Sequence, residues 1–195
     1  DHQGHISRMK AAIQALGVDP DRLTIITHQM IAVKSNGQSL RASKRTGDII
    51  TLEEILDEVG ADACRYFFLA RSPESQMEFD LELAVKQSND NPVYYIQYAH
   101  ARISGILRLA KKRGIDHTDG DLNLLVHQVE ISLVKKMLEL PELIETMARK
   151  LEPHHLPHYA VEVATAFHLF YDQCRVVSSA PEDAQITKAR VKLVE

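Results

Sequence analysis

The fold is decided by residues 91–113, NPVYYIQYAHARISGILRLAKKR. Apolar residues recur in this stretch at intervals of three or four positions, which places them on one face of an α-helix. Asn91 and Pro92 come just before the pattern, and proline suits the first turn of a helix because its missing N–H has no partner there. The stretch therefore predicts a long amphipathic helix over residues 92–113. Its buried face consists of Ile96, Ala99, Ile103, Ile106 and Ala110.

Two more apolar stripes follow, each with the same helical spacing. The first predicts a helix that Pro141 breaks or kinks, since proline cannot continue the hydrogen-bond ladder. Three amphipathic helices can bury their apolar faces only against one another, so the second half of the chain is predicted to be a helical bundle. The stripes are Leu122, Val126, Val129, Leu133, Met137 and Leu140, and then Val163, Phe167, Phe170, Cys174 and Val177.

The sequence before the bundle predicts mixed α and β structure. Residues 6–16 have helical spacing and Gly17 follows as a stop. The β-branched stretch LTIITHQMIAVK, residues 23–34, predicts a strand. Asn36-Gly37 suits a type I′ hairpin turn, in which both central residues need positive φ. We expect a short returning strand over residues 38–40.

A capping box is predicted at Thr51, because Glu54 stands three residues later and each side chain can reach the other's backbone N–H. A helix over residues 52–59 follows, with Gly60 as its stop. Asp62 is expected to cap the next helix, whose apolar part is ACRYFFLA. The polar segment RSPESQMEFD, with Pro73, predicts a domain boundary near residues 72–80.

Composition places the chain among globular proteins: it has 195 residues, of which 45% are hydrophobic, enough for one large or two small domains. No 18-residue apolar run and no secretory leader are visible, so we expect a cytoplasmic protein without a membrane partner. Cys64 and Cys174 are far apart in apolar surroundings and are expected to be reduced. The net charge of -4 argues against nonspecific coating of nucleic acid.

Two local groups of cations stand out against the acidic whole. Arg41, Lys44 and Arg45 lie between Gly37 and Gly47. Such a run is commonly a solvated surface turn. Alternatively, with the Ser43 hydroxyl, the cations could close over a polyphosphate and meet the charge that grows on a departing pyrophosphate.

The second group lies on the helix of residues 92–113, which has no acidic residue. Its cations suit RNA phosphates, and its tyrosines suit stacking on unpaired bases. The alternative is that the tyrosines fill the core and the cations only solvate the helix. The candidate RNA-binding residues are Tyr94, Tyr95, Tyr98, His100, Arg102, Arg108, Lys111 and Lys112, with Arg113 beside them.

The segment HHLPH contains His154, His155 and His158. Three histidines could suggest a metal site, but Pro153 and Pro157 predict a loop and no cysteine or carboxylate pair completes a ligand set. We therefore expect a polar connection between helices and no metal.

Four blocks of the sequence resemble the bacterial type of arginyl-tRNA synthetase, a class I family. They are RASKRTGDIITLEEILDEVGADACRYFFL, FDLELA, NPVYYIQYAHARI and FYDQCRV, in an order and spacing that agree over nearly the whole chain. The KMSK signature of class I enzymes matches Arg41, Ala42, Ser43 and Lys44. The first lysine is thus arginine and the methionine is alanine.

The resemblance implies specific roles in ATP binding. Lys44 would be catalytic, acting on the pyrophosphate. The opening DHQGH is similar to a family segment at the carboxyl edge of a late Rossmann strand, although a frayed terminus is the alternative for the isolated chain. The implied ATP-binding residues are Asp1, His2, Arg41, Ser43, Lys44 and Arg45.

The resemblance also implies the domain organisation. The fold is expected to be mainly α. Residues 1–72 would end a Rossmann-type α/β catalytic domain with a short β-hairpin, and residues 80–195 would form an all-helical anticodon-binding bundle, truncated at its end. No HIGH-type motif is present, so this chain would be a carboxyl-terminal fragment that is inactive alone.

The parent would activate arginine with ATP and Mg²⁺ and transfer it to tRNA(Arg), with no cofactor built into this part. Two alternatives remain, a non-enzymatic RNA-binding module and a plain helical interaction domain.

Overall fold

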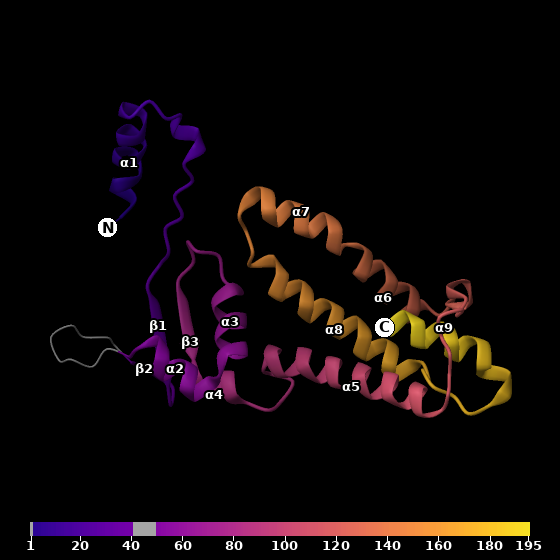
Figure 1. The fold of residues 1–195 in the computed structure, drawn as a ribbon. Helices are drawn as coiled ribbons and strands as arrows, with labels where there is room; N and C mark the ends of the chain where they lie inside the picture. Colours follow the sequence, from indigo (N-terminus) through magenta and orange to yellow (C-terminus); the bar gives the residue numbers. More distant parts are fainter. Residues whose placement is uncertain (1, 41–49) are drawn as a thin grey trace.

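A computed structural model describes residues 2–40 and 50–195 of the chain. The first helix, α1 (Gln3–Ala15), ends as predicted at Gly17, whose φ is 80°. The N–H of Val18 donates to the carbonyl of Ile13 at 3.1 Å, which closes the last turn. None of the residues of α1 is buried. Figure 1 shows this helix standing apart from the rest of the chain, at the far end of an extended segment.

The sheet has three strands in the order β2-β1-β3. Strand β1 (Ile31–Ser35) pairs with the antiparallel β2 (Gln38–Leu40), and the turn between them has φ values of 51° at Asn36 and 74° at Gly37. The type I′ hairpin is therefore confirmed. Strand β3 (Met77–Asp80) pairs in parallel with β1, in the register Ile31 to Met77.

One expectation for this region was wrong, and one strand was not predicted. The strand predicted from residue 23 begins only at Ile31, because residues 23–30 are extended but have no strand beside them; a 3₁₀ turn, η1 (Pro20–Arg22), precedes them. The polar segment around Pro73, predicted to lie at a domain boundary, also contains β3, a strand that the sequence analysis did not predict. Its alternation of buried Met77 and Phe79 with Glu78 and Asp80 is the pattern of a strand with one face in a core.

Three short helices cover this sheet. The capping box before α2 (Leu52–Val59) is confirmed, with Thr51 Oγ1 accepting from the N–H of Glu54 at 3.2 Å. Helix α3 (Ala61–Leu69) follows at Gly60, and α4 (Leu81–Val85) continues directly from β3. Asp62 does not cap α3; the cap residue is Gly60, and the Asp62 carboxylate instead accepts a bond from Gln97 at 3.1 Å.

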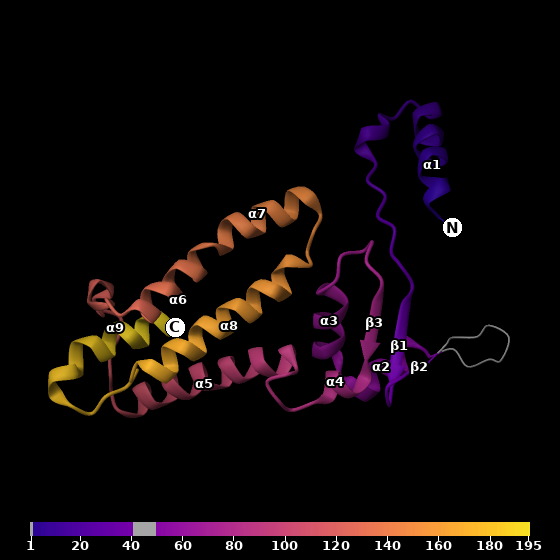
Figure 2. The same ribbon diagram turned by 180° about the vertical axis from the view of Figure 1, so that it is seen from behind.

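The rest of the chain forms the predicted helical bundle. It contains α5 (Pro92–Lys112), α6 (Gln128–Leu138), α7 (Leu140–Lys150), α8 (His155–Gln173) and α9 (Ala184–Val194), with 3₁₀ turns η2 (Leu122–Leu124) and η3 (Pro181–Asp183). In Figures 1 and 2, α8 runs between α5 and the α6–α7 pair, and α9 closes the end away from the sheet. Its core includes Ala110, Phe170 and Val191, none of them exposed.

Two details of the bundle differ from the prediction. The second helix starts at Gln128 and not near Leu122, and Val126 is 78% exposed. A capping box of His127 and Glu130 sets this start. The HHLPH segment is not a loop throughout, because α8 begins at His155; Pro157 lies in its first turn, where a missing N–H costs no hydrogen bond. The break before Pro141 is confirmed, since α6 ends at Leu138 and α7 begins at Leu140.

The buried residues form two clusters. One extends from Val33 to Val93 and includes the free Cys64, and the other extends from Ala99 to Val194 and includes the free Cys174. Both clusters therefore take residues from α5. The predicted domain limits, 1–72 and 80–195, stay a prediction, although residues 77–93 pack with the first cluster.

Candidate nucleic-acid interface

Three side chains one turn apart on α5 lie along the outside of the helix. The rings of Tyr94 and Tyr98 are nearly parallel, with their centroids 6.1 Å apart and an angle of 9° between the planes. The guanidinium carbon of Arg102 lies 4.4 Å from the centroid of the Tyr98 ring. This order follows from the sequence, because residues spaced by four are neighbours on a helix surface.

Helix α8 adds a fourth member that the sequence did not predict. The Arg102 guanidinium also lies over the ring of Tyr171, 4.6 Å from its centroid, so it is held between two aromatic rings. Such cation–π contacts favour a planar guanidinium. We call Tyr94, Tyr98, Arg102 and Tyr171 the aromatic ladder. Tyr171 lies in FYDQCRV, but only the packing of α8 on α5 places it here.

Hydrogen bonds fix Arg102 within the ladder. Its Nη2 donates to the Tyr98 hydroxyl at 2.9 Å, and its Nη1 lies 3.5 Å from the Asp172 carboxylate. The Nδ1 atom of His168 lies 3.3 Å from the same Nη1. The predicted RNA-binding cation is thus oriented by residues of both helices.

Buried His168 lies behind the ladder and was also missed by the sequence reasoning. Its Nε2 lies 3.5 Å from the carbonyl of Tyr95. A neutral ring with its proton on Nε2 satisfies both this carbonyl and Arg102. Burial lowers the pKa of His168, and the positive charge of Arg102 acts in the same direction, although the carbonyl of Tyr95 and Asp172 oppose it.

Tyr95 and His100 do not belong to the ladder. The Tyr95 ring faces His168 at 4.6 Å and packs against the core of the bundle, while His100 is exposed elsewhere on α5. Their predicted contact with RNA stays a prediction.

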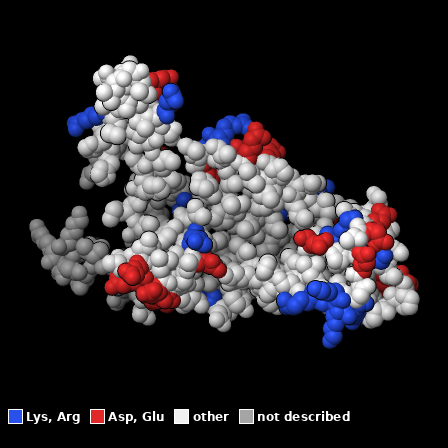
Figure 3. Space-filling model, viewed as in Figure 1, with Lys and Arg blue, Asp and Glu red and all other residues white. Residues whose placement is uncertain are grey.

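The carboxyl-terminal end of α5 carries four exposed cations: Arg108, Lys111, Lys112 and Arg113. Figure 3 shows basic side chains gathered over this end of the helix. Arg108 and Lys112 stand about four and five helical turns beyond Tyr94 and therefore share its side of α5. One side of the helix thus presents aromatic rings in its first half and positive charge in its second half.

Most residues predicted to bind ATP cannot be placed. Asp1, Arg41, Ser43, Lys44 and Arg45 lie outside the described residues. His2 lies just before α1, with its ring 5.8 Å from that of His5. Its role in ATP binding stays a prediction.

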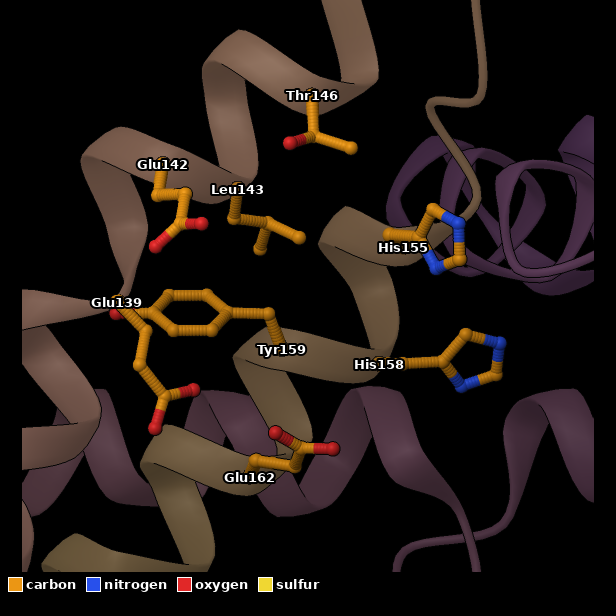
Figure 4. A pocket seen from close by; sticks show the side chains of 8 residues that line it. All are labelled: Glu139, Glu142, Leu143, Thr146, His155, His158, Tyr159 and Glu162. Atoms are coloured by element: carbon orange, nitrogen blue, oxygen red, sulfur yellow. The ribbon is translucent and has the colours of Figure 1, made fainter. Parts of the chain in front are cut away.

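A cavity of about 360 Å³ lies between α7 and α8. Figure 4 shows the His155 and His158 rings turned away from Glu139 and Glu142. Two of the lining carboxylates share one partner: Lys136 bonds both Glu139, at 2.8 Å, and Glu162, at 2.9 Å, and these contacts raise the pKa of Lys136. The histidine ring of His158 contacts the carbonyl of Ala70 at 3.0 Å. We therefore assign no ligand to this cavity.

Within residues 2–40 and 50–195, no three histidine, cysteine or acidic side chains come together in a way that could hold a metal ion. Over the same residues, no helix has the length and apolar character needed to cross a membrane.

A comparison with protein-family models identifies the family of the helical bundle. Residues 96–195 match the model of the DALR anticodon binding domain. The chain belongs to the DALR anticodon-binding family. The match covers all of α5 except its first four residues, including Tyr98, Arg102 and the basic end, together with all of α8.

Curated relatives extend the likeness over the whole chain. It is 60% identical over 195 residues to an arginine–tRNA ligase of Dehalococcoides mccartyi and 49% identical over 198 aligned residues to one of Moorella thermoacetica. All of this chain is covered in both cases, but only 34% and 35% of the relatives. The chain therefore spans about a third of their length.

Solved structures agree. A crystal structure from Campylobacter jejuni, of a protein assigned as an arginyl-tRNA synthetase, matches all of this chain with a TM-score of 0.83 and 33% identity, over 42% of its own length. The Thermus thermophilus arginyl-tRNA synthetase matches 83% of this chain with a TM-score of 0.60; at 22% identity it supports the fold alone.

Proposed function

We propose that this chain is the carboxyl-terminal third of an arginine–tRNA ligase and that it binds the anticodon loop of tRNA(Arg) along α5. The observation that carries the proposal is the aromatic ladder beside the basic end of α5, in a bundle of the DALR anticodon-binding family. The likeness to arginine–tRNA ligases over the full chain supports the choice of tRNA(Arg).

The ladder suits unpaired bases. Both faces of the Tyr98 ring already have neighbours, Tyr94 on one side and Arg102 on the other, so a base would stack on the outer rings of the ladder. Stacking on an aromatic side chain contributes roughly 1–3 kcal/mol per base. Arg108, Lys111 and Lys112 would hold the phosphates beside those bases.

The full-length protein is proposed to activate arginine with ATP and Mg²⁺ before transfer to tRNA. The KMSK-like residues, with Lys44 foremost, would meet the charge that develops on the departing pyrophosphate. Mg²⁺ would accompany the ATP phosphates, and we assign it no ligand among the described residues. We place the protein in the cytoplasm, where its tRNA substrate is used.

The salt dependence of RNA affinity tests whether this side of α5 binds RNA. We expect the chain to bind an anticodon stem-loop of tRNA(Arg) more weakly as salt rises, because bound cations displace counterions from phosphates. Replacing Arg108, Lys111 and Lys112 with alanine should reduce the slope of log affinity against log salt by roughly 0.7 for each contact to single-stranded RNA.

The variant Tyr171→Ala is compared with this triple variant, because it removes an aromatic ring and leaves every cation in place. It should lower affinity at every salt concentration and leave the slope unchanged, because stacking releases no ions. An unchanged slope in the triple variant, measured by fluorescence anisotropy, would show that this side of α5 does not bind RNA. RNA binding by a full-length protein that attaches no arginine would favour the non-enzymatic module.

A further inference from the structure

The His168 side chain is enclosed behind the aromatic ladder and has little room to turn. Three aromatic rings surround it, with centroids at 4.6 Å for Tyr95, 5.6 Å for Tyr98 and 5.7 Å for Phe167. The residue is only 8% exposed. Its Nδ1 lies 3.3 Å from Nη1 of Arg102. The imidazole therefore offers one acceptor atom to Arg102 from a fixed place.

The guanidinium of Arg102 can meet RNA only with its edge, because the rings of Tyr98 and Tyr171 cover its two faces. An arginine side chain has five N–H groups. Three of them have the partners His168, Asp172 and the Tyr98 hydroxyl. The other two, one on Nε and one on Nη2, have no partner within residues 2–40 and 50–195. Such an edge binds phosphate oxygens or base acceptors in a defined direction.

His168 determines where this edge points. The other partner of Nη1 is the Asp172 carboxylate, which is 66% exposed and lies 3.5 Å away, a long distance for a hydrogen bond. If His168 offered no acceptor, Asp172 would be the remaining partner of Nη1 in the described part of the chain. We expect the guanidinium then to turn toward Asp172 and away from the rings. A proton on Nδ1 has the same effect, since an imidazolium has no acceptor atom.

The charged and titratable groups that face His168 come from α5 and α8. They are Arg102, the phenol groups of Tyr95 and Tyr98, and Asp172, which stands one turn later on α8. Burial and the charge of Arg102 lower the pKa of His168, while the Tyr95 carbonyl and Asp172 act against them. The ring is therefore neutral at pH 7 and takes up a proton only below about pH 6.5.

We propose that His168 is a positioning residue for RNA binding: its neutral ring holds the Arg102 guanidinium between the two tyrosines, with the open N–H edge directed at an acceptor of the anticodon loop. This inference rests on the proposed function of the aromatic ladder. Buried His168 would not touch the RNA itself. Its protonation should weaken RNA binding, although an added positive charge alone would strengthen the attraction to phosphates.

The test measures binding of an anticodon stem-loop of tRNA(Arg) to this chain by fluorescence anisotropy. His168→Phe keeps an aromatic ring and removes the acceptor, whereas His168→Asn keeps an acceptor oxygen near the place of Nδ1 and cannot titrate. At pH 7.5 we expect His168→Phe to bind roughly two- to tenfold more weakly, because Arg102 must then be ordered on binding. His168→Asn should recover most of the affinity.

The pH profile separates positioning from simple charge. Between pH 7.5 and pH 5.5 the wild-type chain should lose affinity relative to His168→Asn, and the histidines common to both cancel in this ratio. His155→Asn is the matched control, the same change at an exposed histidine of α8, and should leave the affinity at pH 7.5 unchanged. A wild-type chain that gains affinity relative to His168→Asn as pH falls would overturn the positioning role.

A double variant shows whether the effect of His168 passes through Arg102. If it does, adding His168→Phe to Arg102→Ala should cause little further loss of affinity. Losses that multiply, or full affinity in His168→Phe while Arg102→Ala binds weakly, would contradict the inference. Full affinity in Arg102→Ala would instead overturn the proposed function of the aromatic ladder.

Discussion

The side chain of Arg102, which we propose faces RNA, already has a fixed orientation in the chain without RNA. Its guanidinium is held between two rings and bonded to Tyr98, so little rotamer entropy is left to lose on binding. The same contacts depend on the charge of His168, whose Nδ1 must accept from Arg102. A proton on that nitrogen would remove the bond and place two cations together.

The first prediction concerns the pH dependence of stability through His168. Because its pKa is lowered in the folded chain, the unfolded chain takes up the proton first as pH falls, which favours unfolding. The stabilising contribution is therefore complete above about pH 6.5 and is lost as pH falls toward and through the lower pKa of the folded state. His168→Phe keeps an aromatic ring but cannot titrate.

Urea unfolding of both proteins at pH 7.5 and at pH 5.5 measures this effect. We expect the wild-type chain to lose more stability over this interval than His168→Phe, whatever the difference between the two at pH 7.5. The histidines common to both proteins cancel in the comparison. Equal losses would show that His168 does not couple protonation to folding.

At the scale of elements, α9 is fastened to the bundle by the chain that leads from α5 to α6. Lys192 donates to the carbonyls of Thr118 and Gly120 at 3.0 and 3.1 Å, and Lys188 bonds Asp119 at 2.9 Å. The backbones approach so closely that a Cβ on Gly120 would lie 2.7 Å from the carbonyl oxygen of Lys188. The glycine is required here by the close approach of the backbones.

We predict that Gly120→Ala destabilises the bundle by about 1–3 kcal/mol, since a backbone carbonyl cannot move aside as a side chain can. Gly105→Ala is the control. A Cβ at this position of α5 would lie 4.0 Å from its nearest neighbour, the side chain of Arg108, and would meet no clash. Because alanine has a higher helix propensity than glycine, this change should stabilise the chain by roughly 1 kcal/mol. Thermal unfolding followed by circular dichroism measures both. A loss of stability of similar size in both variants would contradict the packing argument.

Sequence predicted the elements whose signals are local. The Thr51–Glu54 capping box and the Asn36-Gly37 turn were correct to the residue, because each is determined by neighbours in the chain. The strand predicted over residues 23–34 was too long at its start. The alternation of apolar and polar residues shows which side chains can face a core, but it does not show whether a neighbouring strand is there to pair with. Strand β3 was missed because its partner lies far away in the sequence, although the alternation of Met77 and Phe79 was readable.

The residues of the candidate site also fall into those that the sequence could predict and those that it could not. Helical spacing could bring Tyr94, Tyr98 and Arg102 together, since all three belong to α5. Tyr171, His168 and Asp172 join them only because α8 packs on α5, and no local pattern predicts which residues of two helices meet. The start of α6 was missed because histidine is an unusual capping residue.

At the scale of the whole chain, the two buried clusters differ in size, and the cluster in the bundle is the larger. The bundle takes its core from residues 99–194, with buried residues from α5, α6, α8 and α9, while α7 buries none and packs against α6 and α8. The sheet part has a smaller core, and α1 and the extended segment after it add no buried residue. Few polar contacts join the two parts, among them Gln97 to Asp62 and His158 to Ala70.

We therefore predict that residues 88–195 fold alone, with a cooperative thermal transition and helical circular dichroism, because their core is intact without the sheet. Residues 1–87 should show no cooperative transition, since their core lacks Val93 and their first helix buries no residue. A piece that begins at residue 80 should be no more stable than one that begins at 88, because Leu81 and Ala84 are buried in the other cluster. The opposite result would be noncooperative melting of residues 88–195 together with a single sharp transition of the whole chain. It would show that both clusters form one folding unit.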